Sequence, residues 1–184
     1  MNEKLHKSAG TWNSIKVYLH SLDKSGLIDL IHRIYESDAD VQQALAAKII
    51  RSDQAIDRIR KRIMNFVYPD PFGALPIRAG DALKTIRKFY VVSGDPCAAS
   101  ALLLDGIEAG TDQAADQGIE DEAYFNTLGQ MVQMLVTLQA ELPRRDRRTS
   151  RDRLVRICKT GKDVGWGHGE QLAEAVTALR RMCR

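Results

Sequence analysis

Apolar residues return every third or fourth position along almost the whole chain, and this spacing limits the fold more than any other feature of the sequence. Residues at i, i+3, i+4 and i+7 share one face of an α-helix, whereas a half-buried strand alternates apolar and polar residues. The strongest stripe consists of Ile56, Ile59, Ile63, Phe66 and Val67. We expect Ile59 and Ile63, at its centre, to be buried. The sequence therefore predicts an all-α protein with roughly nine helices, over residues 12–22, 27–35, 41–49, 56–67, 83–90, 98–107, 119–142, 154–158 and 172–179.

Local signals mark several of the expected helix ends. The segment Ser93–Pro96 combines a glycine suited to a left-handed C-terminal position, an aspartate suited to an N-cap and a proline suited to the first helical position. We expect Thr11 and Ser25 to cap the helices that follow them. Residues 68–80 contain three prolines and two glycines, so no helix runs through them. They are the candidate subdomain joint within a single helical-repeat domain, residues 1–184.

One internal similarity bears on how the helices are arranged. Ile31–Tyr35 followed by Asp40 matches Ile86–Tyr90 followed by Asp95 in the same register. A repeated helix–turn–helix unit predicts a right-handed superhelix of antiparallel hairpins, as in TPR or HEAT arrays, because a lone hairpin cannot bury its own apolar face. Chance similarity between two amphipathic helices explains the match equally well.

Most of the chain also resembles a known group of sequences. The resemblance lies in the runs LIDLIHRIYESDADVQQALAAKI, AIDRIRKRI, AGDALKTIRKFYVVSGDPCAASALLLDGIEAG, IEDEAYFNTLGQMVQML and RDRLVRI. They are similar to an uncharacterised bacterial α-helical family, in many members of which this helical region follows a SWIM zinc finger. The zinc-finger pattern, CxC followed by CxH, is absent here. The resemblance therefore implies a helical fold, and it brings neither a zinc or nucleic-acid role nor catalytic residues.

Charge is distributed very unevenly between two segments. Residues 105–122 contain seven acids and no Lys or Arg, whereas residues 141–162 contain nine bases and three acids. Arginine runs of this kind can neutralise phosphates, so the segment 144–156 is a candidate for binding nucleic acid or another polyanion. Pairing with the acidic segment 105–122 is the competing interpretation. The candidate polyanion-binding residues are Arg144, Arg145, Arg147, Arg148, Arg151 and Arg153.

Catalytic, cofactor and metal signals are not found in the sequence. The three cysteines, Cys97, Cys158 and Cys183, form no CxxC pair, and no zinc-ligand spacing is present. His168 lies in the glycine-rich stretch Gly165–Gly169. This stretch is open to two interpretations, an anion-binding loop or a connection between helices with Trp166 folded onto the core. We therefore expect no catalytic, cofactor-binding or metal-binding residues.

The leading functional expectation is a non-catalytic protein–protein interaction or scaffold module. Stacked helical hairpins expose an extended concave face, and such folds usually serve binding. Polyanion or nucleic-acid binding through residues 144–156 is the first alternative, and an enzyme with a site in the helical groove is the second. The sequence shows no secretory leader and no apolar stretch near ~20 residues, so we expect a cytoplasmic protein without a membrane partner. The partner, pathway and oligomeric state are left open.

Overall fold

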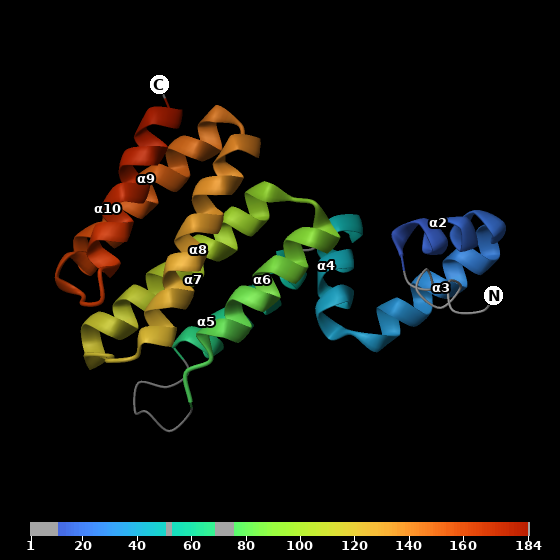
Figure 1. Ribbon diagram of the computed structural model, residues 1–184, viewed down its shortest axis with the longest axis horizontal. Helices are drawn as coiled ribbons and strands as arrows, with labels where there is room; N and C mark the ends of the chain where they lie inside the picture. Colours follow the sequence, from blue (N-terminus) through green and yellow to red (C-terminus); the bar gives the residue numbers. More distant parts are fainter. Residues whose placement is uncertain (1–10, 51–52, 69–75, 184) are drawn as a thin grey trace, which may run out of the picture. The chain divides into compact units, whose positions relative to one another are not determined.

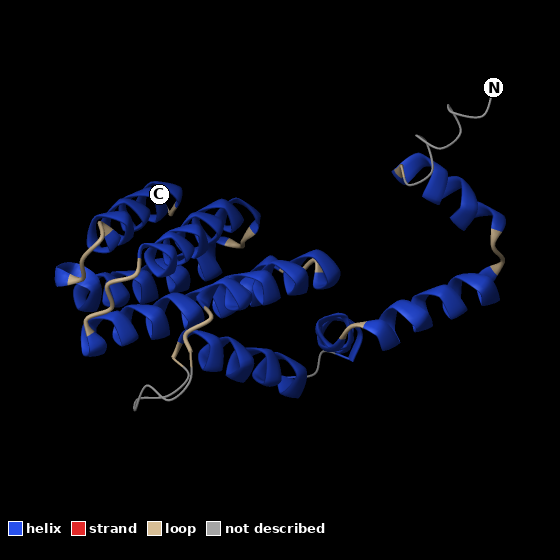
Figure 2. Ribbon diagram, turned by 60° about the horizontal axis from the view of Figure 1, so that its bottom comes forward, coloured by secondary structure: helices blue, strands red, loops and turns tan. Residues whose placement is uncertain are grey.

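The computed structural model describes residues 11–50, 53–68 and 76–183, and within these residues it contains helices and no strand (Figures 1 and 2). The expectation of an all-α protein with about nine helices is confirmed. The α-helices are α2 (Trp12–Ser21), α3 (Lys24–Ser37), α4 (Ala39–Ile50), α5 (Asp53–Val67), α6 (Ala79–Ser93), α7 (Pro96–Gln117), α8 (Glu122–Leu138), α9 (Arg144–Thr160) and α10 (His168–Met182). Two short 3₁₀ helices, η1 (Gln139–Glu141) and η2 (Gly161–Asp163), follow α8 and α9.

The chain divides into two compact units between Gln42 and Gln43, within α4. The described part of the N-terminal unit comprises α2, α3 and the start of α4. The C-terminal unit comprises the rest of α4 and all later helices. Most of the predicted joint at 68–80, residues 69–75, lies outside the described residues, so the division into subdomains there stays a prediction.

The C-terminal unit is built around α7. This helix packs against α5, α6, α8 and α9, and α10 packs against α8 and α9 (Figure 1). From α5 to α7, each helix contacts the next helix and the one after it. Ile63 on α5 is fully buried and Ile59 is 4% exposed, which confirms the expected phase of this helix.

Close approach between helices depends on small residues in the middle of α7. A Cβ atom on Gly110 would lie 2.5 Å from a methyl group of Leu128 on α8 and 3.1 Å from a methyl group of Val67 on α5. Both distances are shorter than van der Waals contact, so a larger residue here would force the Leu128 and Val67 side chains to move. The sequence predicts a tightly packed helix over 98–107, and α7 extends this helix to Pro96–Gln117.

The signals at Ser93–Pro96 act as predicted. Gly94 ends α6 with a φ of 62°, in the left-handed region, and its N–H donates to the carbonyl of Tyr90. Asp95 caps α7, because its carboxylate accepts from the N–H of Ala98 at 3.0 Å. Thr11 likewise caps α2, accepting from the N–H of Ser14.

Two local expectations were wrong. Asp23, not Ser25, caps α3, and its carboxylate accepts from the N–H of Gly26 at 2.8 Å. The helix expected over 154–158 begins at Arg144 as α9, ten residues earlier than predicted. Its first two turns contain no apolar residue, so periodicity gave no signal there, although arginine is a good helix former.

Candidate functional site

The largest exposed apolar feature of the described chain lies on α2 and α3. Neither helix contains a buried residue, and the two do not pack along each other. Apart from Val17 on α2, the exposed large apolar side chains of each helix lie on one stripe, at roughly the spacing of i, i+3, i+4 and i+7. We call these stripes together the α2–α3 apolar surface, and it consists of Trp12, Ile15, Tyr18, Ile28, Ile31, Ile34 and Tyr35, all exposed.

The two helices are electrically neutral as a pair. Residues 12–37 contain three bases and three acids: Lys16, Lys24, Arg33, Asp23, Asp29 and Glu36. The ion-pair distance between His32 and Glu36, one turn apart on α3, is 3.7 Å. The segment that carries the α2–α3 apolar surface therefore has no net charge.

The arginine-rich segment forms the first half of α9, and one of its members pairs with the acidic segment. Arg153 contacts Asp105 on α7 at 2.7 Å and donates through Nε to Glu108 at 2.9 Å. Arg60 on α5 donates to the other oxygen of Asp105 at 2.7 Å. The Asp105 side chain is only 11% exposed, so these two guanidinium groups neutralise a nearly buried carboxylate between three helices.

Two further members of the arginine-rich segment also have partners within the fold. Arg147 donates to the carbonyl of Leu142 at 2.8 Å and to that of Met182 at 3.4 Å, and Arg151 pairs with Asp152. Arg145 and Arg148 are exposed on α9. Part of the predicted polyanion-binding set therefore holds the fold together, and polyanion binding through 144–156 stays a prediction.

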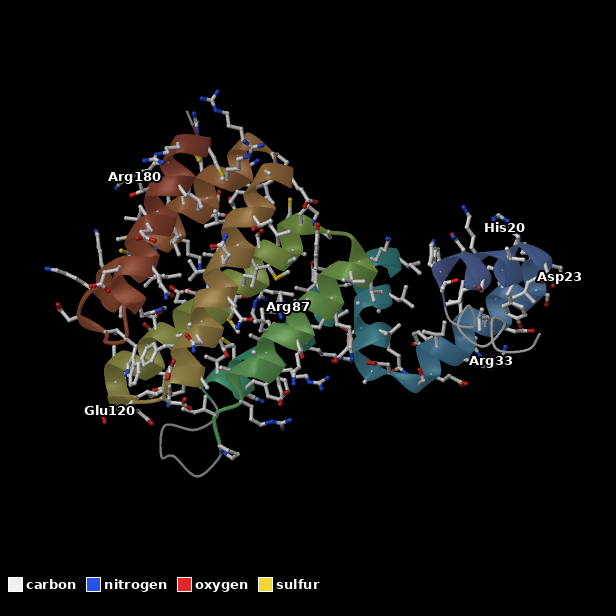
Figure 3. All side chains as sticks on the ribbon, in the orientation of Figure 1. His20, Asp23, Arg33, Arg87, Glu120 and Arg180 are labelled. Carbon is white, nitrogen blue, oxygen red and sulfur yellow. The ribbon has the colours of Figure 1, made fainter. Side chains whose placement is uncertain are left out.

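A surface pocket of about 400 Å³ lies where α7 ends and α8 begins. Phe125 and Trp166 stack in its wall with ring centroids 6.3 Å apart. Glu120, at the turn between α7 and α8 (Figure 3), and Asp163 are its charged lining residues. Lys and Arg are absent from the described lining. This composition suits a cationic group better than an anion, which disfavours the anion-binding interpretation of Gly165–Gly169.

His168 is fully buried at the start of α10 and bonds to α7. Its Nε2 lies 2.9 Å from the hydroxyl oxygen of Thr111, and that hydroxyl donates to the carbonyl of Ile107 at 2.7 Å. The hydroxyl proton is thus already used, so Nε2 must donate, and Nδ1 is left as a buried acceptor without a partner. Burial lowers the pKa of His168 to about 4, which keeps the ring neutral near pH 7. Nothing in the sequence indicated Thr111 as its partner.

The Gly165–Gly169 stretch turns tightly so that His168 can enter the core. Trp166 and Gly167 have φ of 59° and 71°, both in the left-handed region. A Cβ atom on Gly169 would lie 2.9 Å from the carbonyl oxygens of Gly161 and Lys162, so glycine is required for α10 to start against η2. The stretch does not hold the His168 imidazole in solvent, because His168 is the first residue of α10 and is fully buried.

The described residues contain no group of three His, Cys, Asp or Glu side chains that could hold a metal ion.

Burial raises the pKa of the Cys97 thiol, and the nearby Asp146 adds to this effect, so the thiolate is disfavoured there. Within 11–50, 53–68 and 76–183, none of the helices combines the length and the apolar composition needed to cross a lipid bilayer.

Searches of the chain against protein-family models, curated proteins and solved structures returned no match. The fold thus defines the class, an all-helical protein, and the resemblance to the helical region beside SWIM zinc fingers stays a prediction.

Proposed function

We propose that this protein is a non-catalytic helical interaction module and that it binds another protein chain through the α2–α3 apolar surface. One observation carries the proposal: two amphipathic helices expose seven large apolar side chains along their stripes and bury none of their residues. Large exposed apolar patches on a protein mark interaction sites.

The lengths of α2 and α3 strengthen this proposal. They have 10 and 14 residues, and isolated helices shorter than ~12–15 residues are marginal in water. Most helix stability in proteins comes from packing an amphipathic face against something else. Neither α2 nor α3 has a buried residue, so a partner that covers their stripes accounts for both the apolar pattern and the presence of the helices.

The C-terminal unit supports the same proposal from its packing. Helices α5, α6 and α7 each contact the next helix and the one after it, and α10 contacts α8 and α9, as hairpins in a stack would. We propose a TPR- or HEAT-like superhelix for this unit, a fold that commonly serves binding. A cytoplasmic location belongs to the same proposal, since the three free cysteines, Cys97, Cys158 and Cys183, suit a reducing compartment.

Site-specific photo-crosslinking in cells tests the proposal. A photo-reactive amino acid replaces Ile31 on α3 in one chain and Val91 on α6 in a matched control, because Val91 is an exposed apolar residue of the other unit. We expect a discrete protein adduct at position 31 and none at position 91. Equal labelling at the two positions, or no adduct at position 31, would count against an interaction surface on α3.

A further inference from the structure

We infer that the occupant of the α2–α3 apolar surface is the same surface of a second copy of this chain, so that the protein is a homodimer joined through α2 and α3. This inference rests on the proposed function, because it names the partner of the surface already described. It adds a specific geometry: two copies bring four amphipathic helices together, and each buries its stripe against the others.

The area available matches what a dimer needs. The seven side chains of the surface are 39–67% exposed. At ~200 Å² for a fully exposed side chain of this size, these fractions amount to roughly 700 Å² in each copy. A standard stable interface buries ~800 Å² per partner. The exposed area of the two stripes is therefore close to that of a standard interface.

The charges on α2 and α3 favour a second copy over other occupants. A helix pair with a large net charge would repel a second copy of itself. Residues 12–37 instead have equal numbers of acids and bases. Amphipathic helices that lie on anionic membranes are rich in Lys and Arg on their polar face, and this pair is not. A neutral apolar surface is also complementary to itself, as the two-fold symmetry of most dimers requires.

Sedimentation equilibrium of the purified full chain tests the inference. One variant carries Ile28→Asp and Ile31→Asp within the α2–α3 apolar surface. The matched control carries Val91→Asp, which adds a charge at a side chain that is 80% exposed on α6. We expect twice the chain mass of 20.6 kDa for the wild type and for the control.

The double variant should be monomeric, with a dissociation constant raised by about a hundredfold or more, because two carboxylates would be desolvated without partners. Its urea melt, followed by circular dichroism, should keep the main transition of α5–α10, which excludes general unfolding. A monomeric wild type overturns the inference, and so does a dimer that the double variant leaves intact.

The adducts at position 31 separate this inference from the proposed function. An adduct of two identical chains supports the homodimer. A monomeric wild type whose position 31 crosslinks to a different protein overturns the homodimer and leaves the interaction function standing. Crosslinking within one chain, or to lipid, overturns both.

Discussion

At the residue scale, the core of the C-terminal unit depends on side chains such as Ile63. This residue is fully buried on α5, and its Cγ2 atom lies 3.4 Å from where a Cβ atom would be on Gly106 of α7. We expect Ile63→Ala to lower the free energy of unfolding by about 2–5 kcal/mol, because it leaves a cavity where α5 meets α7. Urea unfolding measures the change. The neighbouring variant Met64→Ala, at an exposed position, should cost much less, and a loss below ~0.5 kcal/mol for Ile63→Ala would show that the stripe is not packed.

His168 predicts a dependence of stability on pH. The unfolded chain binds a proton on this residue near pH 6.5, whereas burial lowers the pKa in the folded chain to about 4. The neutral ring therefore makes its full contribution to the free energy of unfolding above pH 6.5, and this contribution is lost progressively as the pH falls from 6.5 towards 4. The full loss is roughly 3 kcal/mol. Urea melts at several pH values across this window measure it.

The comparison that isolates this effect uses His168→Gln, which cannot take up a proton. The difference in unfolding free energy between wild type and variant should shrink as the pH falls through the window. A constant difference between wild type and His168→Gln would mean that His168 is not buried in its neutral form.

At the element scale, the fold followed from the sequence where the signals are local. Ser93–Pro96 was predicted correctly because the glycine, aspartate and proline each act on the backbone within a few residues. In α4, Leu45 and Ile49 lie at helical spacing in the sequence, but Ala44 and Ala47 are buried and Ile49 is 72% exposed. Which face of a weakly amphipathic helix is buried depends on its neighbours, and these are not encoded locally.

The candidate site was harder to predict for the same reason. Both stripes of the α2–α3 apolar surface are visible in the sequence, but periodicity predicts a face that will be covered and says nothing of what covers it. The contacts of Arg153 with Asp105 and of His168 with Thr111 join residues far apart in the chain. The charge pattern offered the first of these pairings as an alternative, and nothing in the sequence indicated the second.

Helix α9 provides a prediction about the arginine-rich segment. We expect Arg153→Ala to lower the free energy of unfolding by about 1–2 kcal/mol, because it leaves Glu108 unpaired and Asp105 with Arg60 alone. Arg148→Ala removes the same charge from an exposed position of the same helix and should stay within ~0.5 kcal/mol of wild type. Chemical denaturation measures both. Equal losses for the two variants would contradict the structural role assigned to Arg153.

At the scale of the whole molecule, the two units differ in how they are stabilised. The C-terminal unit buries its apolar residues around α7, whereas no residue of α2 or α3 is buried. Helices of this length need packing to persist in water. The account therefore requires that the stability of α2 and α3 depends on association, whereas that of α7 does not.

Hydrogen exchange of the full chain at two protein concentrations, on either side of its dissociation constant, tests this requirement most directly. At the higher concentration, amides of α2 and α3 should exchange at least ~10-fold more slowly than at the lower one. The reason is that each ~1.4 kcal/mol of association free energy slows exchange by a factor of ten. Amides of α7 should be equally protected at both concentrations. Rapid exchange of α2 and α3 at both concentrations, or protection that does not change on dilution, would contradict the account.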